Sequence, residues 1–178
     1  MRPPLDSDQI DRLFDAAYDE LRRLAAQVGK HRAGATLNPT ALVNEAYVRL
    51  RRLLRVEPAS ELHFRRIVAQ AMRQVLVEAA RRRQSQKRGG DTPFVTFDEE
   101  RDTWTVACDS VIRLDEALDE LSRLHPRQAL LVECRFFGGL RGPEIATLLD
   151  VSLATVERDW RLARAWLSLR VRGEPAAE

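Results

Sequence analysis

The chain has 178 residues, of which 44% are hydrophobic and 31% charged, which suits a soluble globular protein of one medium or two small domains. Its formal net charge is only +2, so any nucleic-acid binding has to come from local basic patches. The N-terminus lacks an apolar signal region, and no apolar run reaches the ~18 residues that a membrane span needs. We therefore expect a cytoplasmic protein with no membrane insertion.

Residues that commonly carry catalysis or bind metal ions are scattered along the chain. Cys108 and Cys134 form no CxxC or Cys/His ligand spacing, and they are most simply a linker thiol and a core thiol, with pairing left open. His31, His63 and His125 lie in different elements without a neighbouring nucleophile or carboxylate at triad spacing. We expect no enzyme activity, no metal site and no cofactor.

Three helices are predicted in the first half of the chain from apolar residues at helical spacing. The first covers residues 8–28. The second covers residues 39–54, with Asn38 as N-cap and Pro39 at the first helical position. The third follows Ser60, a second candidate cap, and runs from about residue 61 to the high eighties.

The third predicted helix is strongly basic. Only Glu61 and Glu78 oppose its positive charges, which are those of Arg65, Arg66, Arg73, Arg81, Arg82, Arg83, Lys87 and Arg88. A solvated face is the alternative interpretation of these charges, and cations that complement the helix dipole would account for only one or two of them. Three consecutive arginines followed by a Lys-Arg pair favour a surface that contacts phosphates.

A linker is predicted at residues 89–109, because Gly-Gly-Asp-Thr-Pro ends the basic helix and no regular element is convincing in the mixed stretch that follows. The predicted fold class is therefore all-α, with two small helical domains at residues 1–88 and 110–172, and with a polar tail at residues 173–178.

The second half contains the pattern of a helix-turn-helix at residues 140–167. Helices beginning near Ser110 and at Pro126 precede it, and Gly138-Gly139 predicts a left-handed cap between them and the motif. Ser152 follows a tight turn and is placed to cap the last helix. An ordinary packed helical hairpin is the alternative, but a recognition helix that enters the DNA major groove fits the pattern better.

Four segments resemble the extracytoplasmic-function (ECF) sigma factors of bacterial RNA polymerase, and together they cover nearly the whole chain. They are NPTALVNEAYVRL (38–50), AMRQVLVEAARRRQSQKRGG (71–90), LDEALDEL (114–121) and RFFGGLRGPEIATLLDVSLATVERDWRLARAWL (135–167). The closest likeness is to the subfamily marked by the PTALV-EAY run and the RDWRLARAWL ending. The resemblance implies that residues 1–88 are sigma region 2 and residues 110–172 sigma region 4.

The resemblance also implies three sets of site residues. The contact with core polymerase would involve Thr40, Asn44, Glu45 and Arg49. The minus-ten element and promoter melting would involve Arg55, Ser60, His63, Arg73, Arg81, Arg82, Arg83, Lys87 and Arg88. The minus-thirty-five element would be read by Ser152, Ala154, Thr155, Arg158 and Arg161.

The resemblance implies a sigma factor that directs core enzyme to specific promoters and aids their melting, with core polymerase and promoter DNA as partners. An anti-sigma factor or another regulator is left open. This chain departs from the family pattern at Leu153-Ala154, where the recognition helix starts, and at Ala41, in the segment that the resemblance assigns to the core contact. The alternative is a stand-alone helix-turn-helix regulator, which would bind duplex DNA without polymerase, usually as a dimer.

Overall fold

The computed structural model describes residues 7–27, 38–53, 60–86, 95–98, 103–106 and 108–172. Within these ranges the chain forms seven helices and one short hairpin. The elements are α1 (Ser7–Gln27), α2 (Pro39–Leu53), α3 (Glu61–Gln86), β1 (Val95–Asp98), β2 (Thr103–Val106), α4 (Cys108–Leu124), α5 (Pro126–Gly138), α6 (Gly142–Leu149) and α7 (Leu153–Arg172).

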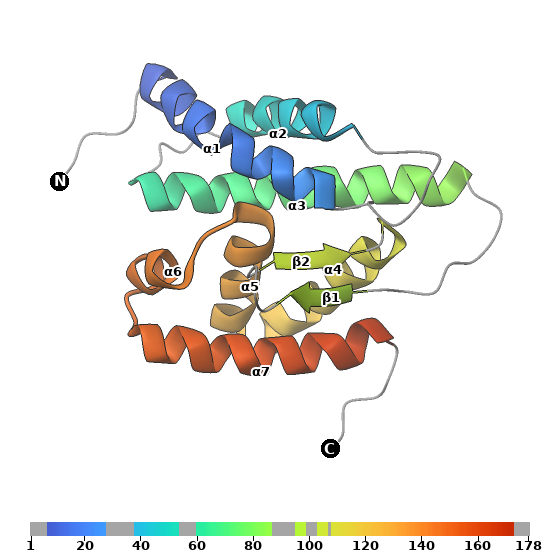
Figure 1. Ribbon diagram of the computed structural model, residues 1–178, viewed down its shortest axis with the longest axis vertical. Coiled ribbons are helices and arrows are strands. Elements are labelled where there is room, and N and C mark those ends of the chain that lie inside the picture. Colours follow the sequence, from blue (N-terminus) through green and yellow to red (C-terminus); the bar gives the residue numbers. More distant parts are fainter. Residues whose placement is uncertain are drawn as a thin grey trace.

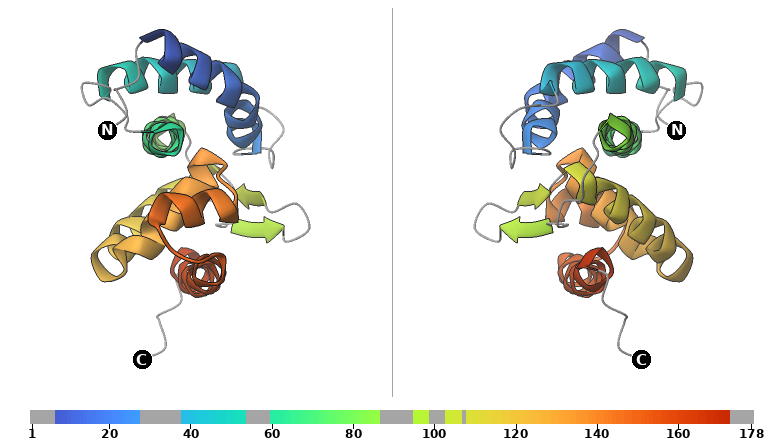
Figure 2. Two further views of the ribbon diagram at one scale, coloured as in Figure 1. Left: turned by 90° about the vertical axis from the view of Figure 1, so that its left-hand side faces the viewer. Right: turned by 90° about the vertical axis from the view of Figure 1, so that its right-hand side faces the viewer.

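The helices are stacked in layers around α3 (Figure 1). Helices α1 and α2 run in opposite directions on one side of α3, while α4 and α5 pack against its other side. Helix α7 lies on the far side of α4 and α5, and Figure 2 shows both α3 and α7 nearly end on. Helix α3 is therefore the element that joins the N-terminal helices to the C-terminal ones.

Side-chain caps begin three helices where the sequence predicts them. The Asn38 Oδ1 accepts the backbone N–H of Thr40 at 3.1 Å, and the Ser60 Oγ accepts that of His63 at 3.1 Å. The Ser152 Oγ does the same for Thr155 at 3.1 Å. Each cap satisfies an N–H that has no partner within its helix, so these three predicted boundaries are confirmed.

Two left-handed residues end the helices that precede and open the helix-turn-helix. Gly139 has φ 62°, and the Leu140 N–H reaches back to the Cys134 carbonyl at 3.1 Å, which is the arrangement expected of a glycine cap. Asp150 adopts φ 52° after α6 without being a glycine, as short polar residues tolerate. The predicted turn between the two helices of the motif is confirmed.

The hairpin β1–β2 corrects one expectation, because it forms where the sequence predicted no regular element. Its antiparallel register places Phe97 opposite Trp104 and Thr96 opposite Thr105. β-branched and aromatic residues favour extended backbone, which suits them to such strands. Each strand is only four residues long, too short for the alternation to stand out in the sequence. The hairpin leaves the predicted fold class, all-α, confirmed for the helices that build the core.

Among the residues that the structure describes, buried side chains from all seven helices form one continuous core. Helix α3 contributes most, and its buried positions extend around about two thirds of its circumference at ~100° per residue. Phe64, Val68 and Val75 lie on one face, whereas Ala69, Val77 and Ala80 lie on the opposite face. A helix buried on two sides has to hold two layers together.

No helix in the described ranges is both long enough and apolar enough to cross a bilayer.

Candidate nucleic-acid interface

The outer face of α2 is exposed at Ala41, Asn44, Glu45 and Val48, which we call the α2 outer face. These positions are three or four residues apart and therefore share one side of the helix. Val48 is 45% exposed, which is high for a large apolar side chain. Of the four residues predicted to contact core polymerase, Asn44 and Glu45 lie on this face, whereas Val48 was not predicted as part of this contact.

Arg49, also predicted to contact core polymerase, is turned inward and ties α2 to α3. Its Nη1 donates to Glu78 Oε1 at 2.7 Å, and its Nε donates to Glu45 Oε1 at 3.3 Å. The hydrogen bonds from Arg49 hold the pKa of Glu78 below its usual range. Thr40 is half-buried in the first turn of α2, where its N–H bonds the Asn38 cap.

Helix α2 is joined to α1 by a second polar contact. The Tyr47 hydroxyl donates to Asp11 Oδ1 at 2.7 Å, and Arg51 lies 3.3 Å from the same oxygen. The hydrogen bond to Asp11 raises the pKa of Tyr47, and desolvation adds to the effect. These contacts fix the orientation of α2, and with it the direction in which the α2 outer face points.

The residues predicted for minus-ten binding divide along α3. Ser60 is committed to its cap, and His63 is half-buried in the first turn. Arg81 and Arg82 are exposed near the end of the helix, with Arg82 72% exposed and 3.2 Å from Glu78 one turn earlier. Arg55, Lys87 and Arg88 lie outside the described residues, as does the side chain of Arg83.

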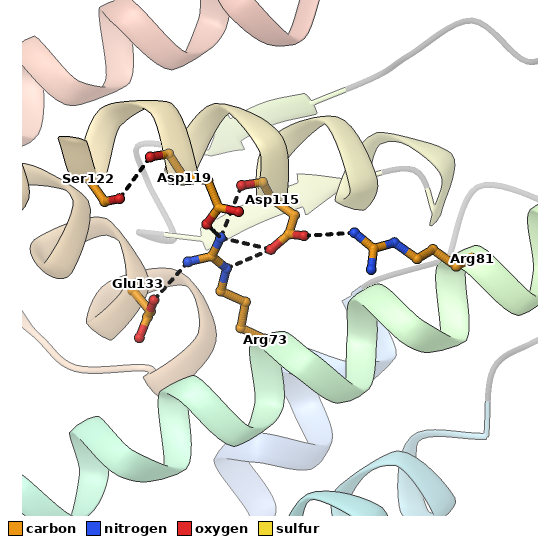
Figure 3. Close-up of polar contacts among 6 residues, drawn as sticks. All are labelled: Arg73, Arg81, Asp115, Asp119, Ser122 and Glu133. Atoms are coloured by element: carbon orange, nitrogen blue, oxygen red, sulfur yellow. Dashed lines mark hydrogen bonds and ion pairs between the residues drawn. The ribbon is translucent and has the colours of Figure 1, made fainter. Parts of the chain in front are cut away.

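Arg73 has a different environment from the other arginines of α3, because carboxylates of α4 and α5 surround it (Figure 3). Its Nε donates to Asp115 Oδ1 at 2.8 Å, its Nη1 to Glu133 Oε2 at 3.0 Å and its Nη2 to Asp119 Oδ1 at 2.6 Å. The Nη2 also reaches the Asp115 backbone carbonyl at 3.0 Å. We call Asp115, Asp119 and Glu133 the acidic cluster.

The Arg73 side chain is only 15% exposed, so its charge is held in a largely desolvated place. Desolvation alone would lower its pKa, but the hydrogen bonds to Glu133 and Asp119 and the attraction of Asp115 outweigh it and raise the pKa. Arg81 adds a longer contact, 3.3 Å to the second oxygen of Asp115. A cavity of ≈ 320 Å³ beside these side chains opens between α3, α4 and α5.

A second ion pair joins α3 to the helix-turn-helix. Arg65 binds Glu144 through its Nη1, and Glu144 uses its other oxygen to accept the backbone N–H of Arg141 at 2.7 Å. Arg65 also donates to the Gly139 carbonyl at 3.4 Å. Glu144 thus caps α6 and anchors it to α3 at the same time.

Helix α7 presents an exposed stripe at Ala154, Arg158, Arg161 and Ala165, which we call the α7 outer stripe. Its opposite side is buried in the core through Val156, Trp160, Ala163 and Leu167, the face that the sequence predicted. The arginines of the stripe therefore point away from the core, and the first of them, Arg158, follows the Ser152 cap by six residues. Thr155 is half-buried, and its hydroxyl is 2.9 Å from that of Ser152.

A buried carboxylate, which was not predicted, lies behind the stripe. Asp159 is 3% exposed, accepts the Nε–H of Arg127 on α5 at 2.7 Å, and lies 3.7 Å from the Nε of Arg158. A buried carboxylate needs such partners to offset the loss of hydration. Asp159 therefore restrains Arg158, and it brings Arg127, which is half exposed, to the edge of the same surface.

The described residues contain no group of three or more histidine, cysteine or acidic side chains arranged to hold a metal ion. Cys134 is fully buried in α5, and desolvation is the main reason that its pKa is raised to about 12. Such a thiol stays protonated at neutral pH and is inert.

A helix-turn-helix whose second helix is capped at its start and carries outward arginines is an arrangement found in proteins that place this helix in the DNA major groove. The family model described as ECF sigma factor matches residues 5–173. The chain belongs to the ECF sigma factor family and is a transcription initiation factor that works with core RNA polymerase and promoter DNA. Among curated proteins, no sequence gives a significant match.

Proposed function

We propose that this chain directs core RNA polymerase to a bipartite promoter and aids its melting, as a member of the ECF subfamily marked by the PTALV-EAY and RDWRLARAWL motifs. In this proposal residues 1–88 act as region 2, residues 110–172 act as region 4, and the complex works in the cytoplasm. The observation that carries the proposal is the α7 outer stripe, which offers Arg158 and Arg161 on one exposed face.

The α2 outer face is the proposed contact for core polymerase. Asn44 and Glu45 offer an amide and a carboxylate to the partner, while Val48 supplies an apolar centre. Interfaces commonly combine such an apolar centre with a polar rim. Arg49 supports this face by tying α2 to α3, and the Thr40 N–H binds the Asn38 cap at the start of α2. An anti-sigma factor that covered the same face would block assembly.

The C-terminal part of α3 is the proposed track for the melted minus-ten strand. Exposed Arg81 and Arg82 provide positive charge along one helix end, as single-stranded nucleic acid requires. The expected contribution of Arg83, Lys87 and Arg88 extends this track, and Arg55, Ser60 and His63 belong to the expected site for a flipped base. Extruding a base costs a few kcal/mol of stacking, which contacts to the single strand offset.

The α7 outer stripe is the proposed reader of the minus-thirty-five element. Arginine recognises guanine through two parallel hydrogen bonds in the major groove, and Ala154 would suit a thymine methyl group. Ser152 and Thr155 sit at the first turn, where recognition helices approach the bases and phosphates.

Transcription in vitro tests the proposed function directly. Core polymerase with and without the chain is supplied with a fragment library of genomic DNA, and the 5′ ends of the transcripts are mapped. We expect start sites that depend on the chain and that share two upstream motifs. Tight duplex binding by the chain alone, without any stimulated initiation, would indicate a stand-alone regulator instead.

A paired substitution tests the core contact. Asn44→Lys with Glu45→Lys adds three positive charges to the α2 outer face and should abolish co-purification with core polymerase. Asp15→Lys with Ala16→Lys adds the same charge to exposed positions of α1 and serves as the matched control. Equal recovery of core polymerase with both variants would refute this contact.

A further inference from the structure

The most unusual feature of the α3 surface is that Arg73, a proposed DNA contact, is already occupied. Its guanidinium nitrogens face the acidic cluster at 2.6 to 3.0 Å, so three carboxylates take the positions that phosphates would take. We propose that the acidic cluster is an internal substitute for DNA, which holds the free chain in a closed form and keeps α3 from single-stranded DNA. This inference rests on the proposed function of α3.

The chemistry of the contact makes the two partners of Arg73 mutually exclusive. Arginine binds carboxylate and phosphate through the same planar set of donors. With Nε, Nη1 and Nη2 all engaged and the side chain 15% exposed, a phosphate can bind only after the acidic cluster withdraws. Arg81, 3.3 Å from Asp115, is partly drawn into the same arrangement.

Close apolar packing next to Arg73 closes the interface. A Cβ atom built on Gly138 of α5 would lie 2.9 Å from the Cβ of Ala69, four residues before Arg73 on α3. Only a glycine allows the end of α5 to approach α3 so closely. Together with the Arg65–Glu144 pair, this contact joins α3 to the helices of the proposed region 4 along much of its length.

The size of the closed form gives an independent argument. A compact chain of this length has a radius of gyration of about 16 Å and is about 40 Å across. Minus-ten and minus-thirty-five elements, as their names imply, lie about 25 base pairs apart, or about 85 Å at ~3.4 Å per base pair. The closed form therefore cannot contact both elements, and α3 has to part from α4 and α5 before a promoter is engaged.

The order of events follows from which surfaces the closed form leaves exposed. The α2 outer face is exposed on the side of α3 away from the acidic cluster, so core polymerase can bind the closed chain. The α7 outer stripe is also exposed. In the closed form Arg73 is covered, and the two DNA-binding parts lie too close together to reach both promoter elements. Opening on core polymerase exposes Arg73 and lets the two parts move apart.

Neutralising the acidic cluster tests the inference while leaving every proposed DNA contact in place. The variant combines Asp115→Asn, Asp119→Asn and Glu133→Gln. The matched control combines Asp8→Asn, Asp15→Asn and Glu116→Gln, which remove the same charge from exposed positions of α1 and α4. Small-angle scattering measures the radius of gyration, and fluorescence anisotropy measures binding of a mixed-sequence single-stranded DNA of about 12 nucleotides.

We expect the cluster variant to expand and to bind the single strand about tenfold more tightly than the control, because breaking a buried ion pair destabilises the closed form. Equal size and equal affinity in the two variants would overturn the inference. Expansion without a gain in affinity would overturn it as well, since opening would then not expose a DNA-binding surface.

Gly138→Ala provides a second, charge-neutral test. Alanine is a better helix former than glycine, so α5 itself is retained, but the added methyl group forces α3 and α5 apart. We expect expansion and a gain in single-strand affinity in the same direction, smaller than in the cluster variant. A fully folded Gly138→Ala chain with unchanged size and affinity would contradict the inference.

Transcription with core polymerase keeps this inference separate from the proposed function. If the cluster variant expands and gains single-strand affinity while neither it nor the wild type supports initiation, the internal contact stands and the sigma role fails. If both support initiation but the variant stays compact with unchanged affinity, the sigma role stands and the internal contact fails.

Discussion

Helices α3 and α7 both carry arginines that we propose to contact DNA, but these arginines differ in their exposure and in their acidic neighbours. Arg73 on α3 is 15% exposed and binds three carboxylates of other helices, whereas Arg158 on α7 is 60% exposed and has one acidic neighbour, Asp159, at 3.7 Å. Both stood out in the sequence only as positive charges on a helix. The difference shows that a basic residue becomes a binding residue only if the fold leaves its donors available.

The comparison also separates two kinds of restraint. Asp159 lies on the same helix as Arg158 and orients an arginine that still reaches solvent. The acidic cluster lies on other helices and covers Arg73, so releasing that arginine requires helices to move apart. The first arrangement suits a preformed reader of duplex DNA, and the second suits a surface that is used only after a conformational change.

The largest difference between α3 and α7 is expected in the stability of the fold when Arg73 or Arg158 is substituted by methionine. Arg73→Met leaves the acidic cluster without its counter-charge and should lower the free energy of unfolding by about 3 kcal/mol, as expected for a broken buried pair. Arg158→Met should change it by less than about 0.5 kcal/mol, as for other surface positions. Urea unfolding followed by circular dichroism measures both. Equal losses would remove the distinction drawn between α3 and α7.

The α7 outer stripe should govern base discrimination. Arg158→Ala should reduce the preference for the best minus-thirty-five base at one position by about 1–3 kcal/mol. Sequencing of transcripts from a promoter library randomised in that element gives the preference. Arg164→Ala, at a half-buried position off the stripe, is the control. An unchanged profile with Arg158→Ala would exclude this residue from base readout.

The exposed end of α3 should govern salt dependence instead. Arg81→Gln with Arg82→Gln should flatten the slope of log affinity against log salt by about 0.7 for each lost contact to a single strand, with little change in sequence preference. Arg12→Gln with Arg22→Gln removes equal charge from exposed positions of α1 and should leave the slope unchanged. The same slope in both variants would identify Arg81 and Arg82 as a solvated face.

The smallest effect is expected at the pair that joins α2 to α3. Because Arg49 lowers the folded pKa of Glu78, this carboxylate stabilises the fold above its ordinary pKa of 4.5, and the stabilisation is lost as the pH falls through the folded value. Glu78→Gln should therefore cost less than about 1 kcal/mol at pH 7, since Glu78 is partly exposed. Urea unfolding should show this difference shrinking below pH 4.5; a constant difference would exclude the pairing as its cause.

Local signals in the sequence predicted the helices and the inner face of α7 well. The caps at Asn38, Ser60 and Ser152 act within three residues of themselves, and periodicity placed Val156, Trp160 and Leu167 on one buried side. Cys134 was predicted as a core thiol and is buried. Such features depend on short-range geometry, which a sequence displays directly.

Features that depend on distant segments were not predicted. The second buried face of α3, at Ala69, Val77 and Ala80, was not predicted, because two alanines and a single valine also occur at exposed helix positions. The Arg127–Asp159 pair joins residues 32 positions apart, and the partners of Arg73 lie 42 to 60 positions away. The hairpin likewise needed the pairing of two strands, each too short to be recognised alone.

The sequence by itself determined the helices, the helix-turn-helix and the resemblance to a sigma factor, because each is written in neighbouring residues. Only the tertiary structure decided which basic residues remain available, because the docking of α3 on α4 and α5 brings charges together that are far apart in the chain. Whether an arginine meets phosphate or carboxylate is a property of that docking.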